Sequence, residues 1–300
     1  MMAITRARLA LEGLSVGDAF GEQLLHAGPA ARSLALGERI MPAVPAVGRR
    51  WMWTDDTAMA ISIVEVLDAH GGIDLDRLAD AFARRYAAEP ARGYGGGAHQ
   101  VLAEIASGTP FDVAASALFD GQGSCGNGGG MRSAPIGAYF ADDLDAVVAH
   151  AARSAAPTHA HPDGVAGAIA IAVAAASVVA GERDPRGLLE TVVARTPAGP
   201  TREGVRRAIA LLQAEPITVA AALGNGSRVL AADTIPFAAW CAATHLDDFA
   251  GACWACASVG GDIDTTCAMV GGIIVGAVGL AGIPDAWRAS REPLPGVPPE

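Results

Sequence analysis

Two short clusters of threonine and aspartate each stand directly before an apolar helical stretch. Their members are Thr54, Asp55, Asp56 and Thr57 in the first cluster, and Asp262, Asp264, Thr265 and Thr266 in the second. Such residues commonly cap helices, because their oxygens accept backbone N–H bonds near the positive end of the helix dipole. One cap needs only one such residue, and carboxylates packed together repel each other unless a cation offsets their charge. The clusters therefore predict cation binding, with helix capping as the alternative.

Both clusters offer only oxygen donors. Hard ions such as Mg²⁺, Mn²⁺ and Ca²⁺ prefer these donors, whereas zinc prefers nitrogen and sulfur. If the fold brings the clusters together, they could hold a two-metal site with a bridging water. Cys253 and Cys256 form a CxxC motif without a second ligand pair, a pattern typical of small buried thiols on a helix.

Glycine-rich segments at 92–97 and 124–132 interrupt the apolar chain at two further places. Such loops expose backbone N–H groups and let a phosphate approach closely, although neither follows the Walker or dinucleotide pattern. Tyr94 could stack on a base or ribose. His159 and His161 precede an apolar helix, and they could bind a metal or a sugar or satisfy loop backbone groups.

Apolar residues at three- and four-residue spacing predict helices along nearly the whole chain. The expected helices cover residues 5–16, 57–70, 74–88, 97–107, 110–119, 144–154, 164–180, 184–194, 201–214, 218–223, 233–244, 247–258 and 265–280. Strand-like alternation is almost absent, and no long linker divides the chain. We therefore expect an all-α protein with a single compact domain over residues 1–291 and a proline-rich tail over 292–300.

Asp18, in the GDAFG stretch, could orient another group or cap a helix.

Composition limits the partners and the compartment. Of the 300 residues, 51% are apolar and 18% are charged, which excludes wholesale disorder. The net charge of -11, with arginine as the only strong base, disfavours nucleic acids and anionic membranes as partners. Five cysteines, an odd number, and the absence of a secretory signal predict a reduced, cytoplasmic protein. The apolar stretches 164–180 and 267–283 are expected to be buried core helices, because they are rich in alanine and glycine and lack basic flanks.

The order of these motifs resembles the ADP-ribosylglycohydrolase family, which includes dinitrogenase-reductase-activating glycohydrolases and animal ADP-ribosyl-acceptor hydrolases. The matching stretches are GDAFG, WTDDT, RGYGGG, GNGGGMRSAPIG, THAHP and GGDIDTT. The resemblance implies an orthogonal all-α helical domain that binds two Mg²⁺ or Mn²⁺ ions. The metal ligands it implies are Thr54, Asp55, Asp56, Asp262, Asp264 and Thr265. The substrate-binding residues it implies are Tyr94, Gly95, Gly97, Cys125, Gly126, Asn127, Gly128, Gly129, Met131 and His159.

The chain departs from the family at one position. Members usually carry a glutamate seven residues after the aspartate of the first motif, but this position holds Leu25, and Glu22 lies nearby. Either Glu22 replaces the usual acid, or that acid is missing. The acceptor preference and the rate depend on which of these holds.

The resulting hypothesis is metal-assisted hydrolysis of the C1″ glycosidic bond in an ADP-ribosylated protein side chain or small molecule, with release of ADP-ribose. Asp55, Asp264 and Glu22 are the expected catalytic residues, which would transfer the proton. The alternatives are a non-catalytic ADP-ribose-binding or structural protein, and a metal-dependent nucleotide diphosphate hydrolase. We expect no membrane partner, and no nucleic acid except an ADP-ribosylated end. The acceptor, and the choice between Mg²⁺ and Mn²⁺, stay open.

Overall fold

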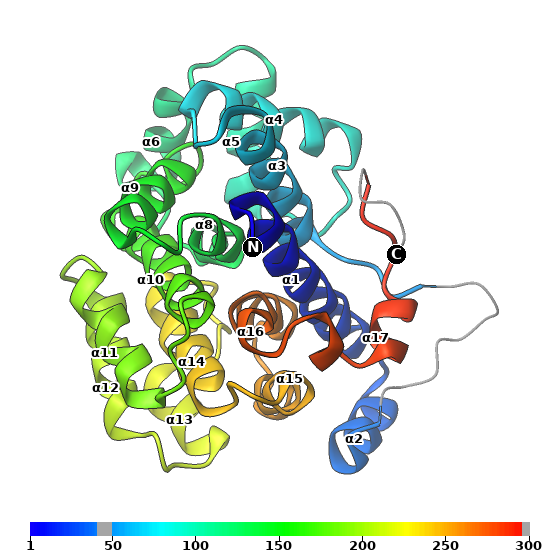
Figure 1. Ribbon diagram of the computed structural model, residues 1–300. Helices are drawn as coiled ribbons and strands as arrows, with labels where there is room; N and C mark the ends of the chain where they lie inside the picture. The colour runs from blue at the N-terminus through cyan, green and yellow to red at the C-terminus, as the bar shows by residue number, and fades with distance from the viewer. Residues whose placement is uncertain (41–49, 296–300) are drawn as a thin grey trace.

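The computed structural model describes residues 1–40 and 50–295, and every regular element in these ranges is a helix (Figure 1). The helices are α1 (Ala3–Leu25), α2 (Pro29–Glu38), α3 (Asp55–His70), α4 (Leu75–Ala88), α5 (Gly96–Ala106), α6 (Phe111–Gly121), α7 (Gly128–Met131), α8 (Ala134–Tyr139), α9 (Leu144–Ala155), α10 (Pro162–Val179), α11 (Pro185–Arg195), α12 (Pro200–Ala210), α13 (Pro216–Leu223), α14 (Ala231–Thr244), α15 (Phe249–Ser258), α16 (Ile263–Val278), the 3₁₀ helix η1 (Leu280–Gly282) and α17 (Asp285–Ser290). Strand pairing within the described residues is limited to two isolated bridges. The predicted all-α fold is confirmed.

The helix boundaries differ from the sequence expectation mainly near glycine and proline. α1 continues through the GDAFG stretch to Leu25, whereas the periodicity predicts an end at residue 16. α2, which begins at a proline, was not expected at all. The glycine loop at 124–132 contains α7, so part of it is helical rather than extended. α16 begins at Ile263, two residues earlier than predicted, which places Asp264 and Thr265 in its first turn.

α1 and α16 lie side by side in the middle of the molecule and pack backbone against backbone (Figure 1). A Cβ atom at Gly17 would lie 2.1 Å from the carbonyl oxygen of Cys267, and one at Gly21 would lie 2.4 Å from Cα of Asp264. Only glycine permits so close an approach. Because residues four apart share one helix face, these glycines dock the GDAFG stretch against the start of α16.

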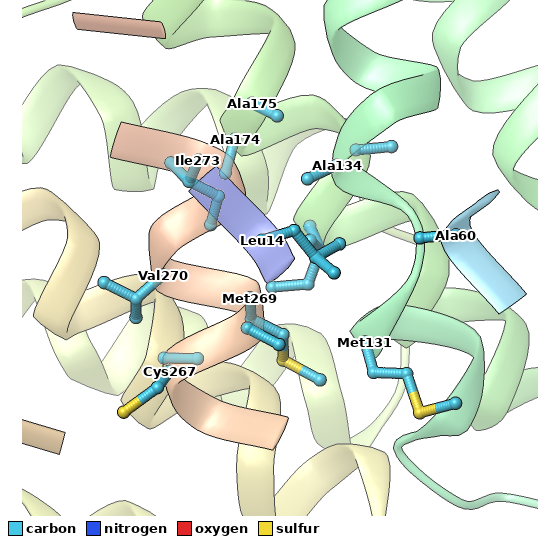
Figure 2. Close-up of a cluster of buried hydrophobic side chains, with 14 of the residues drawn as sticks. Leu14, Ala60, Met131, Ala134, Ala174, Ala175, Cys267, Met269, Val270 and Ile273 are labelled. Atoms are coloured by element: carbon cyan, nitrogen blue, oxygen red, sulfur yellow. The ribbon is translucent and has the colours of Figure 1, made fainter. Parts of the chain in front are cut away.

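α10 is apolar nearly all round and lies in the core. Its length and hydropathy would suit a membrane span, but 83% of it is buried inside the protein, as in a core helix of a soluble domain. Figure 2 shows a nearby part of the core, where Ala134 and Ala174 lie among the larger side chains of Leu14 and Ile273. Alanine and glycine therefore allow the central helices to approach closely.

The beginning of the predicted tail at 292–300 is bound to the domain. Arg92 donates a hydrogen bond of 2.7 Å to the carboxylate of Glu292, and the backbone of Glu292 donates to Trp51 O at 2.9 Å. Leu294 is buried. Residues 296–300 lie outside the described residues, and the domain boundary at 291 stays a prediction.

Candidate active site

The two threonine–aspartate clusters meet in the fold. Thr54 is the N-cap of α3, where its hydroxyl accepts from the backbone N–H of Asp56 at 3.3 Å. Asp262 is the N-cap of α16. Oδ2 of Asp56 lies 3.1 Å from Oγ1 of Thr54 and 3.5 Å from Oγ1 of Thr265. One carboxylate of the first cluster thus contacts both clusters, although 209 positions separate Asp56 from Thr265.

Asp18, from the middle of α1, fixes the first cluster. Its fully buried carboxylate accepts from the backbone N–H and the hydroxyl of Thr54, both at 2.9 Å. It also accepts from the backbone N–H of Thr57 at 3.2 Å and from the hydroxyl of Thr57 at 2.5 Å. Asp18 therefore orients both threonines, and its contact with the N–H of Thr57 also satisfies a free amide in the first turn of α3.

The clusters concentrate negative charge in a buried region. Burial, reinforced by the carboxylate of Asp264, raises the pKa of Asp18 to about 7 and likewise raises the pKa of Asp262 to about 7. Burial and the neighbouring Asp18 raise the pKa of both Asp55 and Asp56 well above the usual range. Such mutual repulsion destabilises the charged form of each group unless a cation binds nearby.

The donor set fits a hard cation. Oδ1 of Asp56 is buried and has no hydrogen-bond partner among the described residues, so this oxygen is free to act as a ligand. Across residues 1–40 and 50–295, no three His, Cys, Asp or Glu side chains form a group that could hold a metal by themselves. The threonine hydroxyls beside Asp56 supply additional oxygen donors, which suit Mg²⁺ or Mn²⁺ better than zinc.

The glycine loop before α7 adjoins the second cluster. Nδ2 of Asn127 donates to Asp262 Oδ2 at 2.6 Å and to Thr234 Oγ1 at 3.1 Å. Two of the loop glycines border a buried histidine: Cβ positions at Gly126 and Gly128 would lie 3.5 and 3.3 Å from Nε2 of His159. Asn127 therefore links the loop to the aspartates, and the ring of His159 lies beside the loop with Nε2 next to Gly126 and Gly128.

The other substrate-binding residues predicted near this loop take different positions. Cys125 is half-buried at the loop entrance. Gly129 faces the backbone of α10, where a Cβ would lie 3.0 Å from Gly164 O. Met131 lies in the hydrophobic core (Figure 2). His161 caps α10, because its Nδ1 accepts from the backbone N–H of Asp163 at 3.1 Å.

The second glycine loop touches the first cluster. The backbone N–H of Asp55 donates to Arg92 O at 2.7 Å. Tyr94, which the sequence offered as a stacking platform, is only 4% exposed, and its ring packs edge-on against Tyr86. The exposed aromatic residue beside this loop is instead Phe119, whose ring would lie 3.7 Å from a Cβ at Gly97. Gly95, by contrast, is exposed and has open space around its Cα.

Glu22 stands at the edge of the site. It lies one helical turn after Asp18 and directly follows Gly21, the glycine that contacts Asp264. Its Oε1 lies 2.8 Å from Nε2 of His26, an exposed residue four positions later. Leu25 packs against the hydrophobic core. The position of the family's usual glutamate is therefore apolar here, and the nearest acid on α1 contacts a histidine.

Sequence reasoning missed the loop between α13 and α14. Its Asn225 O accepts from the backbone N–H of Asp262 at 3.2 Å, and its Val229 O accepts from the backbone N–H of Asn127 at 3.1 Å. Val229 is exposed and has a φ of 57°, a strained backbone for a β-branched residue. The stretch Gly224-Asn225-Gly226 resembles the glycine loop before α7, and this similarity was the available signal.

Comparisons with known proteins cover almost all of this chain. A model of the ADP-ribosylglycohydrolase family matches residues 2–296. ADP-ribosylhydrolase ARH3 from Homo sapiens is 31% identical over 273 residues, which cover 80% of this chain and 74% of the relative. ARH3 from Danio rerio is 28% identical over 337 residues, which cover 97% of this chain and 88% of the relative. A solved structure titled "ADP-ribosylglycohydrolase-related protein complex" covers 97% of this chain and 93% of its own, with a TM-score of 0.68 and 23% identity. That likeness shows the fold.

Proposed function

We propose that this chain, which belongs to the ADP-ribosylglycohydrolase family, hydrolyses the bond between C1″ of ADP-ribose and an acceptor and releases ADP-ribose. The observation that carries the proposal is the meeting of Asp56 with threonines of both clusters, beside a glycine loop. The substrate would be an ADP-ribosylated protein side chain or a small-molecule conjugate, as the relatives named ADP-ribosylhydrolase suggest.

The two clusters would hold two divalent cations. The proposed ligands are Thr54, Asp55, Asp56, Asp262, Asp264 and Thr265. When bound, Mg²⁺ or Mn²⁺ would supply Lewis-acid polarisation of a water and of the ribose hydroxyls. The unpartnered Oδ1 of Asp56 supports this assignment, because a buried carboxylate oxygen without a hydrogen bond is destabilising unless something binds it.

The chain's own residues would carry the proton and the charge. As the bond to the acceptor breaks, positive charge develops on C1″, and the nearby carboxylates stabilise it. The oxygen of the attacking water forms a new bond to C1″, and its proton passes to Asp55 or Asp264. That proton is then transferred to the group that carried the ADP-ribose, as this group leaves C1″. Glu22, whose carboxylate contacts His26, is proposed as the group that would deliver that proton.

The glycine loops would bind the part of the substrate that is remote from the reacting carbon. Exposed backbone N–H groups in a glycine-rich turn favour a diphosphate. Phe119, exposed and adjacent to Gly97, offers an aromatic face for a base. Binding energy from these remote groups would position C1″ against the carboxylates.

We also propose a cytoplasmic location. All five cysteines are free thiols, and four of them are buried, which suits a reducing compartment. Cell fractionation that finds the protein only outside the cytoplasm would contradict this part of the proposal.

Product release from a mixed substrate panel tests the function. The panel holds arginine- and serine-linked ADP-ribosyl peptides, O-acetyl-ADP-ribose and free ADP-ribose, each with Mg²⁺, Mn²⁺ or a chelator. Metal-dependent release of intact ADP-ribose supports the proposal and identifies the acceptor. Release of AMP instead indicates a diphosphate hydrolase, and metal-dependent binding without turnover indicates a non-catalytic reader.

A matched pair of variants makes the test specific to the site. Asp264→Asn is expected to abolish most turnover while the protein stays folded, because it removes one carboxylate from the second cluster. Asp184→Asn is the control, since Asp184 caps α11 by accepting from Gly187 N–H far from the site, and asparagine keeps that cap. Near-normal turnover by Asp264→Asn would refute the assignment.

A further inference from the structure

Arg132, in the residues directly after α7, is a buried cation without a carboxylate partner. It is 1% exposed, and none of the ion pairs among the described residues involves it. Its guanidinium lies 4.5 Å from the centre of the Phe82 ring. One terminal nitrogen donates to Ser154 O at 2.9 Å and to the hydroxyl of Thr158 at 2.7 Å. Its other terminal nitrogen lies 3.3 Å from the sulfur of Met59, and the negative charges of Asp55 and Asp56 attract the guanidinium. A buried guanidinium without a direct ion pair depends on such contacts for its stability.

The hydroxyl of Thr158 connects this arginine to His159. An arginine can only donate hydrogen bonds, so Oγ1 of Thr158 is the acceptor in their contact. The single hydroxyl proton of Thr158 then has two candidate acceptors: Nδ1 of His159 at 2.8 Å and Ala155 O at 3.5 Å. The contact with Ala155 O is longer than the usual O–H···O range of about 2.5–3.0 Å, which favours donation to Nδ1 of His159. A hydroxyl that already accepts from a cation is also a stronger donor.

We propose that Arg132 and Thr158 are positioning residues that hold His159 in the tautomer with its proton on Nε2. Because Nδ1 accepts from Thr158, a neutral imidazole must carry its proton on the other nitrogen. Nε2 faces the glycine loop, 3.5 and 3.3 Å from where Cβ atoms at Gly126 and Gly128 would lie. The ring thus presents a fixed N–H donor to an oxygen bound in that loop.

The electrostatics of the ring agree with this role. Burial and the charge of Arg132 lower the pKa of His159 to about 3, so the ring is neutral at neutral pH. A neutral donor can hydrogen-bond a phosphate or ribose oxygen without taking up a proton when it does so. His159 would therefore orient the substrate rather than act as an acid or a base. The identity of the ligand oxygen rests on the proposed function, whereas the tautomer does not.

Long-range ¹H–¹⁵N correlation spectra of ¹⁵N-histidine-labelled protein measure the tautomer directly, and His159→Gln assigns the signal. The expected wild-type spectrum shows a protonated Nε2 and an unprotonated Nδ1. Thr158→Val removes the relay at almost constant volume and is expected to shift the ring toward the other tautomer. Thr158→Ser keeps the hydroxyl and should restore the wild-type spectrum.

Thr201→Val is the matched control, because the Thr201 hydroxyl is buried, lies outside the relay and has no hydrogen-bond partner in the described part of the chain. Binding of ADP-ribose provides the second readout: Thr158→Val should weaken it about tenfold, the value of one oriented hydrogen bond, and Thr201→Val should not. A wild-type ring protonated on Nδ1, or a Thr158→Val spectrum equal to wild type, would overturn the inference. If wild-type protein has the expected tautomer but does not bind ADP-ribose, the proposed function fails and the relay stands.

Discussion

Replacing Gly17 by alanine is expected to separate α1, whose Asp18 holds the first cluster in place, from α16, which carries the second cluster. The added Cβ would lie 2.1 Å from the carbonyl oxygen of Cys267 and 2.7 Å from its carbon, whereas ordinary contact begins at 3.4 Å. The clashing atoms belong to the backbone, so no side-chain rotation can relieve the overlap. α1 and α16 must therefore move apart locally by about 1.3 Å, the difference between 3.4 and 2.1 Å.

The magnitude follows from two opposing effects. Overpacking of a core typically costs about 1–3 kcal/mol, and a backbone clash belongs at the upper end of that range. Alanine favours a helix over glycine by about 1 kcal/mol, which offsets part of the loss. We expect the free energy of unfolding to fall by about 2 kcal/mol. Asp18 would move relative to Asp264, and a misplacement of about 1 Å can lower turnover about 100-fold.

Urea unfolding and kcat/KM on an ADP-ribosylated substrate measure the two effects separately. Gly37→Ala is the control, because Gly37 lies in α2 and a Cβ there meets no atom of the described residues within 4 Å. This control should be slightly more stable than wild type and equally active. If Gly17→Ala is as stable and as active as Gly37→Ala, the close contact between α1 and α16 does not position the site.

Three further outcomes are expected. The pKa of His159 is about 3 in the folded protein and 6.5 in the unfolded chain. Between pH 3 and 6.5, therefore, the unfolded chain binds one more proton than the folded protein. The contribution of the neutral His159 to the free energy of unfolding is complete above pH 6.5 and is lost as the pH falls toward 3. His159→Gln should therefore flatten the pH dependence of unfolding by up to about 1.4 kcal/mol per pH unit between pH 6 and 4, and an unchanged slope in urea titrations would contradict this. Mg²⁺ should raise the melting temperature more at pH 8 than at pH 5, because Asp262, with a pKa of about 7, must lose its proton to bind a cation; an equal rise at both pH values would argue against this site. Val229→Gly should stabilise the protein by about 1 kcal/mol, since it relieves a left-handed β-branched residue, and a lower melting temperature would show that the conformation is not strained.

The sequence was most informative where local rules decide the structure. The periodicity of apolar residues predicts the helices, and the threonine–aspartate clusters stand at helix starts because their oxygens satisfy free N–H groups there. Tertiary packing decided the rest. The glycines of the GDAFG stretch suggest the end of a helix locally, but contact with α16 keeps α1 helical to Leu25. The sequence did not indicate that Arg132 is fully buried, because arginines are seldom buried without a carboxylate partner.

Tyr94 illustrates the same limit within the site. An aromatic residue between glycines suggests an exposed ring, and only the packing of α4 against the following loop reveals that Tyr86 covers it. The exposed aromatic residue of this region, Phe119, lies in a kink with a φ of 53° that no local pattern indicated. Exposure of individual side chains therefore required the three-dimensional structure, even where the loop itself was correctly located.

The pairing of α1 with α16 has a consequence for how the protein is made. Gly17 and Cys267 are 250 positions apart, and a ribosome adding roughly 5–20 residues per second needs roughly 12–50 s to cover that distance. During this interval α16 has not been made, so the face of α1 that carries Gly17 and Gly21 lacks its helix partner. The first carboxylate cluster likewise lacks the second cluster. The proposed activity should therefore appear only after α16 has been synthesised and has docked on α1, so cation uptake by stalled chains of increasing length would report when α16 docks.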